Sequence, residues 1–204
     1  MPETSHHVAL LSTAVRTLLG AGPFDPPRGW THMGAVICDA SFQARRKYRR
    51  QIWPRVDGLR QAWPDAATVS GFRARLAVED LAVAMDFRSP ARVAIAHGIA
   101  GLLAAEGVET REDLYGWLGD PGHRAALRAV KGVGPKTVDY LGNLVGRSSI
   151  AVDQHLSAFA AEAGLPLGLG YERLQAVYER TADALGHDRA GLEHAVWRFK
   201  SEGV

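Results

Sequence analysis

Apolar residues recur at spacings of three and four along most of this chain of 204 residues. That spacing places them on one face of an α-helix, because the helix turns once every 3.6 residues. Alternating apolar and polar segments of useful length, which are typical of half-buried strands, are absent from the sequence. The clearest helical faces are Val8, Leu11, Val15 and Leu18; Val93, Ala96, Ala100 and Leu103; Leu174, Val177, Tyr178, Thr181 and Leu185; and Leu192, Ala195, Val196 and Phe199. We therefore expect an all-α protein.

Helix starts are marked by proline at several places. The first helical position tolerates proline because its backbone N–H would have no partner within the helix. The pairs concerned are Ser89-Pro90, Asp120-Pro121 and Gly134-Pro135. Thr110 and Asp113 have the spacing of a capping box. The stretches 20–29 and 164–170, rich in glycine and proline, are expected to be loops.

The composition is that of a globular protein, with 47% hydrophobic and 23% charged residues. The longest apolar runs, 81–85 and 99–105, are far shorter than the ~20 residues that span a bilayer. The sequence begins without the basic and apolar segments of a secretory signal. We expect a cytoplasmic protein that makes no use of a membrane.

Cys38 is the single cysteine. It excludes an internal disulfide, a cysteine-rich zinc site and a four-cysteine iron–sulfur cluster. The histidine pairs His6-His7 and His187 with His194 lack acidic or cysteine partners at metal-binding spacing. No side-chain metal site is expected.

The net charge is only +2, but the positive charges are concentrated. Residues 41–60 carry seven basic side chains and one acidic one, and residues 121–150 carry five and one. Such polarisation suits a polyanion bound to one face, because each neutralised phosphate releases counterions. The alternative is a set of solvated helix faces whose charges are balanced elsewhere in space. Charge alone does not decide between them.

The most informative segment is a predicted helical hairpin. A helix over 124–130 leads into Lys131-Gly132-Val133-Gly134-Pro135, and a second helix follows from about 136 to 145. Glycines at a helix N-terminus let backbone N–H groups approach a phosphate closely. The alternatives are an ordinary tight hairpin and a nucleotide-binding loop. The latter fits poorly, because proline separates Gly134 from Lys136 and no strand precedes the turn.

Two residues near the hairpin could carry chemistry. Lys136 falls in the first turn of the second helix, where the helix dipole favours a neutral amine. A neutral lysine is a nucleophile that can form a Schiff base with a sugar, although spacing alone favours a surface lysine that touches phosphate. Asp153 follows Ala151-Val152 and precedes Gln154-His155. Aspartate at such a place is first of all a helix N-cap.

The run Val130 to Thr137, followed by Ala151 to His155, resembles the helix-hairpin-helix and Gly/Pro-Asp signature of the endonuclease III-like DNA glycosylase superfamily. The order, spacing and hydrophobic flanks agree, and the resemblance extends over the whole chain. It is to a branch without the iron–sulfur cluster, since the four cysteines are missing.

The resemblance implies two helical lobes with a DNA-binding cleft between them. Residues 30–146 would form the central lobe, with helices over 33–51 and 89–106 and the hairpin at about 124–145. Residues 1–29 and 147–204 would form the second lobe. It also implies a base-excision DNA glycosylase that flips a damaged or modified base out of double-stranded DNA.

Transferred residue by residue, the family's lyase lysine falls on Lys136 and its aspartate falls on Asp153. The resemblance therefore implies that the enzyme also cleaves abasic sites through a Schiff base. Two alternatives stay open: a monofunctional glycosylase in which Asp153 helps water displace the base, and a non-catalytic DNA-binding protein.

The resemblance assigns DNA contacts to the hairpin and implies no required cofactor. A Na or K ion on the backbone carbonyls of Arg128, Val130 and Val133 is common in such hairpins. His155 would touch phosphate, orient Asp153 or only pack beside the helix start. We expect a monomer. The hairpin residues assigned to DNA are Gly132, Val133, Gly134, Pro135 and Thr137.

The early helix is expected to supply further contacts. Relatives often carry there a glutamine that fills the gap left by the flipped base, and Gln43 is the nearest match, or else a plain polar residue. Arg45, Arg46 and Arg49 are expected to meet phosphates. Aromatic residues could stack in the base pocket, although such side chains more often belong to a core. They are Trp30, Tyr48 and Trp53.

Overall fold

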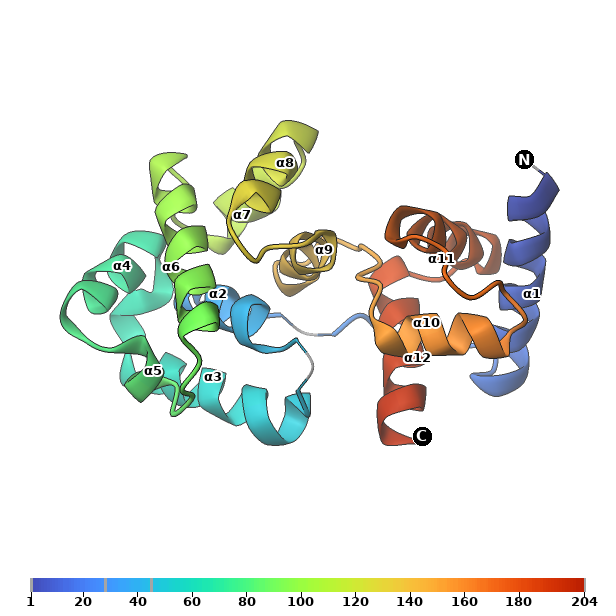
Figure 1. Ribbon diagram of the computed structural model, residues 1–204, viewed down its shortest axis with the longest axis horizontal. Coiled ribbons are helices and arrows are strands. Elements are labelled where there is room, and N and C mark those ends of the chain that lie inside the picture. Colours follow the sequence, from blue (N-terminus) through green and yellow to red (C-terminus); the bar gives the residue numbers. More distant parts are fainter. Residues whose placement is uncertain (1, 28, 45, 204) are drawn as a thin grey trace. The chain divides into compact units, whose positions relative to one another are not determined.

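The computed structural model of the protein describes residues 2–27, 29–44 and 46–203. Within these residues all regular secondary structure is helical and no strand occurs, which confirms the all-α expectation (Figure 1). No helix in this part of the chain is long and apolar enough to cross a membrane. The chain divides into two compact units, unit 1 (Met1–Arg28 with Arg147–Val204) and unit 2 (Gly29–Gly146). We expected the boundary between the lobes to lie between residues 29 and 30, whereas the units meet between residues 28 and 29.

Unit 2 holds the longer continuous run of helices, and unit 1 is assembled from both ends of the chain. The elements of unit 2 are α2 (Met33–Phe42), the π-helical turn η1 (Tyr48–Ile52), α3 (Trp53–Ala62), the 3-10 turn η2 (Pro64–Ala67), α4 (Val69–Val78), α5 (Leu81–Ala84), α6 (Pro90–Ala105), α7 (Arg111–Trp117), α8 (Pro121–Ala129) and α9 (Pro135–Leu144). Those of unit 1 are α1 (Pro2–Leu18), α10 (Gln154–Glu162), α11 (Tyr171–Leu185) and α12 (Arg189–Glu202).

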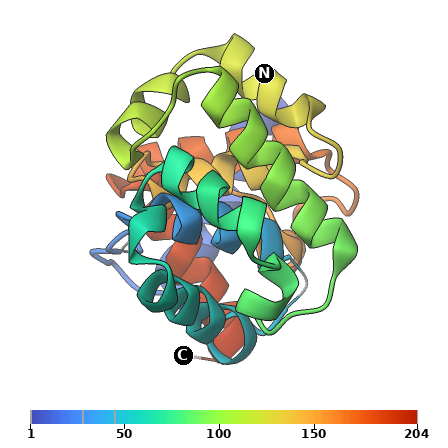
Figure 2. The same cartoon turned by 90° about the vertical axis from the view of Figure 1, so that its left-hand side faces the viewer.

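Helix α2 is the central element of unit 2, and all ten of its residues are buried. It packs against α3, α4, α6 and α9, so it has no solvent face. Figure 2 shows the green helix α6 running diagonally across this unit, beside α4. A helix that is apolar on all sides is stable only inside a core. Asp39 is therefore exceptional, because it carries a carboxyl group into that core.

Unit 1 has its own core. Helix α1 packs against α11, and α12 packs against both α10 and α11. Leu11, Phe159 and Tyr178 are fully buried there. The Tyr178 hydroxyl donates to the Leu156 carbonyl oxygen at 2.7 Å, which gives this buried polar group a partner.

The helix-start signals in the sequence are confirmed. Proline occupies the first turn of α6, α8 and α9. Thr110 and Asp113 form the expected capping box at the start of α7, in which each side chain bonds to the backbone of the other. These local signals succeed because they depend on neighbouring residues alone.

The prediction of one helix over 33–51 is wrong beyond Phe42. α2 ends there, and helical geometry resumes only in η1. Arg92 on α6 stabilises this end. Its guanidinium donates to the carbonyl oxygens of Ser41, Phe42 and Ala44 at 3.2, 2.6 and 2.5 Å. Those oxygens lack intrahelical donors once the helix stops. The basic run therefore lies outside α2, on the less buried segment that follows.

Candidate functional site

The hairpin between α8 and α9 is formed as predicted, with Val130 to Gly134 as its turn. The Val133 N–H donates to the Val130 carbonyl at 2.9 Å. Gly132 has a φ of +91°, and a Cβ built on it would meet Ile95 Cδ1 at 2.8 Å. Any other residue at position 132 would be strained and crowded. The fold itself thus requires this glycine.

Gly134 differs from Gly132, because the fold does not require it. Its φ is −104°, which any residue adopts, and a Cβ built on it would meet nothing within 4 Å. It is the N-cap of α9 and supplies no side-chain cap. The N-cap position therefore places no side chain between the start of α9 and an incoming acceptor. Pro135 occupies the first turn, and Thr137 N–H donates to the Gly134 carbonyl at 3.0 Å.

An ion pair holds the two hairpin helices together. Arg124 on α8 donates through Nη2 to Oδ1 of Asp139 on α9. The Asp139 side chain is 4% exposed, whereas that of Arg124 is 31% exposed. A buried carboxylate needs such a partner, so this pair fixes the position of α9 in unit 2.

Lys136 projects from the first turn of α9 into polar surroundings. Its Nζ donates to Gln43 Oε1 at 2.6 Å and lies 4.8 Å from the centroid of the Tyr140 ring. A carbonyl acceptor and the face of an aromatic ring both favour a positive charge on the amine. The helix dipole favours the neutral form, so the surroundings of Lys136 act against the dipole.

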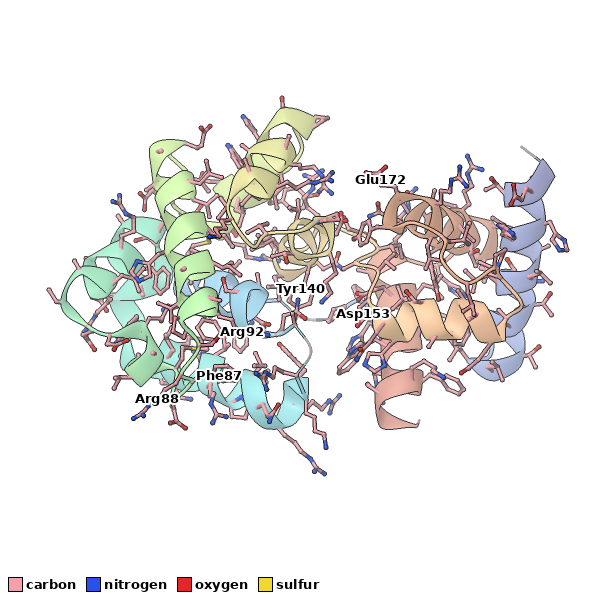
Figure 3. The ribbon with its side chains drawn as sticks, in the orientation of Figure 1. Phe87, Arg88, Arg92, Tyr140, Asp153 and Glu172 are labelled. Atoms are coloured by element: carbon pink, nitrogen blue, oxygen red, sulfur yellow. The ribbon has the colours of Figure 1, made fainter. Side chains whose placement is uncertain are left out.

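Asp39 lies at the centre of a hydrogen-bonded cluster beside Lys136. Its Oδ2 accepts from Trp30 Nε1 at 2.7 Å and from the Tyr48 hydroxyl at 2.6 Å. Its Oδ1 accepts from the Tyr140 hydroxyl at 3.0 Å, and Figure 3 shows the Tyr140 side chain on α9. Burial raises the pKa of Asp39, while these three bonds and the charge of Lys136 act to lower it.

The same burial acts on the two phenols. It raises the pKa of Tyr48 and of Tyr140, and the nearby Asp39 carboxylate raises both further. Both hydroxyls therefore stay protonated and act as donors toward the carboxylate. We name this group, Trp30, Asp39, Tyr48 and Tyr140, the Asp39 cluster.

Sequence reasoning missed Asp39 and Tyr140 as site residues. Two signals could have found them. Asp39 is the one acidic residue in the apolar run 33–42, where a carboxyl group has to be paired. Tyr140 lies four residues after Lys136 on the same helix, which places both on one face.

Gln43 is the C-cap residue of α2 and contacts Lys136. Its Oε1 accepts the lysine hydrogen bond, and its buried Nε2 has no hydrogen-bond partner among the described residues. The assignment of Gln43 as a gap-filling residue stays a prediction. The structure brings Gln43 and Lys136 together although they were chosen from segments far apart in the sequence.

The predicted aromatic residues divide into two kinds. Trp30 and Tyr48 are half-buried and bonded to Asp39. Trp53 is 47% exposed, and its ring lies 6.4 Å from that of Trp30 at an interplanar angle of 28°. An exposed indole stacked on a half-buried one offers a flat apolar surface.

The predicted phosphate-binding arginines follow α2. Arg46 is exposed, and its guanidinium lies 5.1 Å from the centroid of the Phe87 ring. Arg49 is exposed on η1. Arg45 lies outside the described residues. Burial and the charge of Arg46 lower the pKa of Arg92, so positive charges gather in this region. Figure 3 shows Phe87 and Arg92 near the start of α6.

Asp153 belongs to unit 1 and caps α10 (Figure 3). Its Oδ1 accepts from the N–H groups of His155 and Leu156 at 2.8 and 3.1 Å. Its Oδ2 accepts no hydrogen bond from the described residues. The capping role is thus present, and one carboxylate oxygen remains available for a ligand.

His155 packs against an aromatic residue that the sequence did not single out. Its ring lies edge-on to the Trp197 ring, with 6.4 Å between the ring centroids. His194 stacks on the same indole, with 5.8 Å between the ring centroids. His155 is half-buried. Contact with phosphate by His155 stays a prediction.

The carbonyls predicted to hold a monovalent cation lie at the end of α8 and in the turn. Helix C-terminal carbonyls carry partial negative charge, so those of Arg128 and Val130 are suitable oxygen ligands. The Val130 oxygen already accepts from Val133 N–H and keeps a second lone pair. Within the described residues, no group of three histidine, cysteine, aspartate or glutamate side chains is placed to hold a metal.

Comparison of the sequence with models of known protein families gives no match, and comparison with curated proteins gives none either.

Proposed function

We propose that the protein is a base-excision DNA glycosylase that also cleaves the resulting abasic site through Lys136. The observation that carries the proposal is the start of α9. A glycine that the fold does not require leaves the N-cap of α9 without a side chain at Gly134, and a half-buried lysine follows two residues later. A helix start without a capping side chain suits a DNA phosphate, and the lysine suits the neighbouring sugar.

The residues would divide the work as follows. The Asp153 carboxylate would stabilise positive charge that builds on the sugar as the base departs. Arg46 and Arg49 would contact phosphates of double-stranded DNA, and Trp53 would stack against a base. A monovalent ion on the turn carbonyls would add positive charge beside the phosphate. Such an enzyme would act on DNA in the cytoplasm.

The lysine chemistry requires a neutral amine. Its lone pair attacks C1′ of the flipped nucleotide, the bond from C1′ to the base breaks, and the base leaves with that electron pair and takes a proton from water. A proton then passes from nitrogen to the ring oxygen as the C1′–O4′ bond breaks, which gives a protonated imine. Water removes a proton from C2′, and the 3′ phosphate leaves with the electron pair of its C3′–O bond.

Borohydride trapping tests the lysine directly. The wild-type protein, Lys136→Ala and Lys131→Ala are each mixed with duplexes that carry an abasic site or one of a panel of damaged bases. Lys131 is an exposed lysine in the same turn and is the matched control. We expect an adduct with the wild type and Lys131→Ala and none with Lys136→Ala. Trapping that survives in Lys136→Ala would overturn the role of Lys136.

Asp153→Asn tests the second residue. Asparagine is also a good N-cap, so α10 keeps its start and only the charge is lost. We expect base release to slow by about 100-fold or more, as for loss of one transition-state contact. Release at the wild-type rate would exclude the electrostatic role.

Alanine substitutions at the two hairpin glycines distinguish an effect on folding stability from an effect on DNA binding. Gly134→Ala is expected to leave thermal stability unchanged, because a Cβ there meets nothing within 4 Å. It is expected to weaken binding to abasic-site DNA, because the added methyl group would crowd a phosphate that approaches the turn closely. Gly132→Ala is expected to lower stability, because its φ is +91° and Ile95 lies in the way. Unchanged DNA affinity in a folded Gly134→Ala protein would count against phosphate binding at this turn.

A monofunctional glycosylase is the second candidate. The observation that favours it is the pair of contacts that stabilise a charged Lys136, the Gln43 carbonyl and the Tyr140 ring. In that case Lys136→Gln retains base release and changes only DNA affinity and its salt dependence. A protein that shifts DNA in a gel but alters no base under any condition would instead be a binding module.

A further inference from the structure

We propose that Asp39 is a positioning residue that holds Lys136 in its charged form in the free protein, acting through Tyr140 and through its own negative charge. This inference concerns regulation of the proposed site and rests on the proposed function for its catalytic meaning. Its structural content, the charge of Lys136, is testable without DNA.

The first step is the charge of Asp39 itself. Both carboxyl oxygens accept hydrogen bonds, and the indole of Trp30 acts only as a donor. Burial raises the pKa of Asp39, and the three donors aimed at its carboxyl group act against that rise because they stabilise the ionised form. Asp39 is fully buried, so the carboxylate also needs a positive charge nearby.

The second step is the contact with Lys136. The Tyr140 hydroxyl donates to Asp39 Oδ1 at 3.0 Å, while the ring of the same residue lies 4.8 Å from Lys136 Nζ. Donation to a carboxylate shifts electron density into the phenol ring, and a richer ring attracts a cation more strongly. Tyr140 thereby couples the two charged groups. The charge of Lys136 in turn acts to lower the pKa of Asp39.

The third step is the set of groups around the amine within unit 2. Asp39 faces it from α2, Tyr48 follows from η1, and Tyr140 lies on its own helix, α9. Gln43 adds a neutral acceptor. Both tyrosines are neutral because burial raises the pKa of each. Within this cluster, Asp39 is therefore the group whose charge acts on Lys136.

The consequence is a lyase step that is suppressed near neutral pH. A lysine that is stored as an ammonium ion must lose a proton before it attacks C1′. When water displaces the base and Asp153 stabilises the positive charge on the sugar, base release does not need that loss. We therefore expect base release to outpace strand cleavage at neutral pH, and cleavage to accelerate as the pH rises.

The test is a titration of the lysines in the full chain without DNA. The four lysines, Lys47, Lys131, Lys136 and Lys200, are dimethylated with ¹³C-formaldehyde and followed by NMR against pH, with Lys136→Arg to assign the signal. In Asp39→Asn we expect the midpoint of Lys136 to fall by about one pH unit or more, since an opposite charge has been removed. The Lys131 signal serves as an internal control and is expected to titrate alike in all variants.

Tyrosine variants keep the proposal testable if Asp39→Asn fails to fold. Tyr140→Phe keeps the ring and removes its bond to Asp39, whereas Tyr48→Phe removes a bond of the same kind and leaves intact the Tyr140 ring, over which Lys136 Nζ lies. We expect Tyr140→Phe to lower the Lys136 midpoint more than Tyr48→Phe. The proposal would be overturned if the Lys136 titration midpoint were unchanged in Asp39→Asn, or if it moved equally in the two tyrosine variants.

A second measurement separates this inference from the proposed function. Strand cleavage of abasic-site DNA is followed from pH 6 to about 10, spanning the ordinary lysine range. The profile should shift to lower pH in Asp39→Asn together with the NMR midpoint. If the midpoint shifts but no variant cleaves DNA, the lyase function fails and the positioning role stands. If both the wild type and Asp39→Asn cleave DNA with the same pH profile, only the positioning role is excluded.

Discussion

The Tyr140 hydroxyl donates to Asp39 Oδ1 at 3.0 Å across 101 residues of sequence. This bond connects the buried helix α2 to the second helix of the hairpin. It places a carboxyl group from the core beside the same aromatic ring that Lys136 contacts. The proposed reactive lysine is thus supported by a polar cluster inside unit 2 rather than by the hairpin alone.

The ion pair of the hairpin should respond unequally to loss of its two members. Arg124→Ala removes a cation from the buried Asp139 carboxylate, and we expect a loss of about 3–5 kcal/mol in the free energy of unfolding. Asp139→Asn should cost less, because the Arg124 side chain is 31% exposed and keeps water. Urea unfolding measures both. As a surface control, Asp65→Asn removes an exposed pair with Arg75 and should leave stability within error. Equal losses in both hairpin variants would contradict this asymmetry.

Stability should depend on pH through His32. Burial lowers the pKa of His32 from its ordinary value of 6.5. Its Nδ1 accepts from Ala35 N–H at 3.1 Å, and Nε2 bonds to the Trp63 carbonyl at 2.8 Å. Below about pH 6.5 the unfolded chain binds the proton more tightly, so the free energy of unfolding should fall as the pH drops.

The control for His32 is His32→Asn, which keeps a capping side chain and removes the titration. Asp39 acts with the opposite sign, because burial raises its pKa from 3.8 and its contribution falls as the pH rises above that value. The difference between wild type and His32→Asn isolates the histidine. Urea unfolding at pH 7.5 and at pH 5 should show a smaller loss in the variant. Equal losses would mean that His32 does not carry the dependence.

Two helical glycines should respond oppositely to alanine. A Cβ on Gly71 in α4 would lie 1.9 Å from the Asp65 carbonyl oxygen, so the backbone of η2 has to move. We expect Gly71→Ala to lower stability by about 2 kcal/mol or more. A Cβ on Gly101 in α6 would meet nothing within 4 Å. Gly101→Ala should raise stability by about 0.5–1 kcal/mol. Thermal unfolding measures both, and a stabilising Gly71→Ala would show that the close approach to η2 is absent.

The exposed arginines after α2 should determine the salt dependence of DNA binding. Arg46→Gln and Arg49→Gln each remove one expected phosphate contact. The slope of log K against log salt should then weaken by about 0.9 per contact for duplex DNA. Arg16→Gln, an exposed arginine on α1 in unit 1, is the control and should leave the slope unchanged. If Arg46→Gln and Arg49→Gln kept the slope of the wild type, as Arg16→Gln should, these two arginines would not belong to the DNA interface.

Much of the helix pattern could be predicted from sequence, because its causes are local. Pro90, Pro121 and Pro135 begin helices at the expected places, and Thr110 caps α7 as expected. The basic run after α2 could not be predicted in this way. Arg92 lies about fifty positions later and donates to the carbonyl oxygens at the end of α2. The sequence near α2 gives no sign of this contact.

The candidate site was predictable only in part. Lys136 and the hairpin glycines follow from a motif whose spacing is local. Asp39 and Tyr140 were missed, because their meaning depends on which helices pack together.

The helical class, the helix starts and the hairpin follow from the sequence alone, since periodicity, capping and turn chemistry act over a few residues. The electrostatic surroundings of Lys136 arise only when the helices of unit 2 pack together. The charge of an amine depends on what lies within a few ångströms of it in space, and here those groups come from α2 and η1, about ninety residues earlier in the chain.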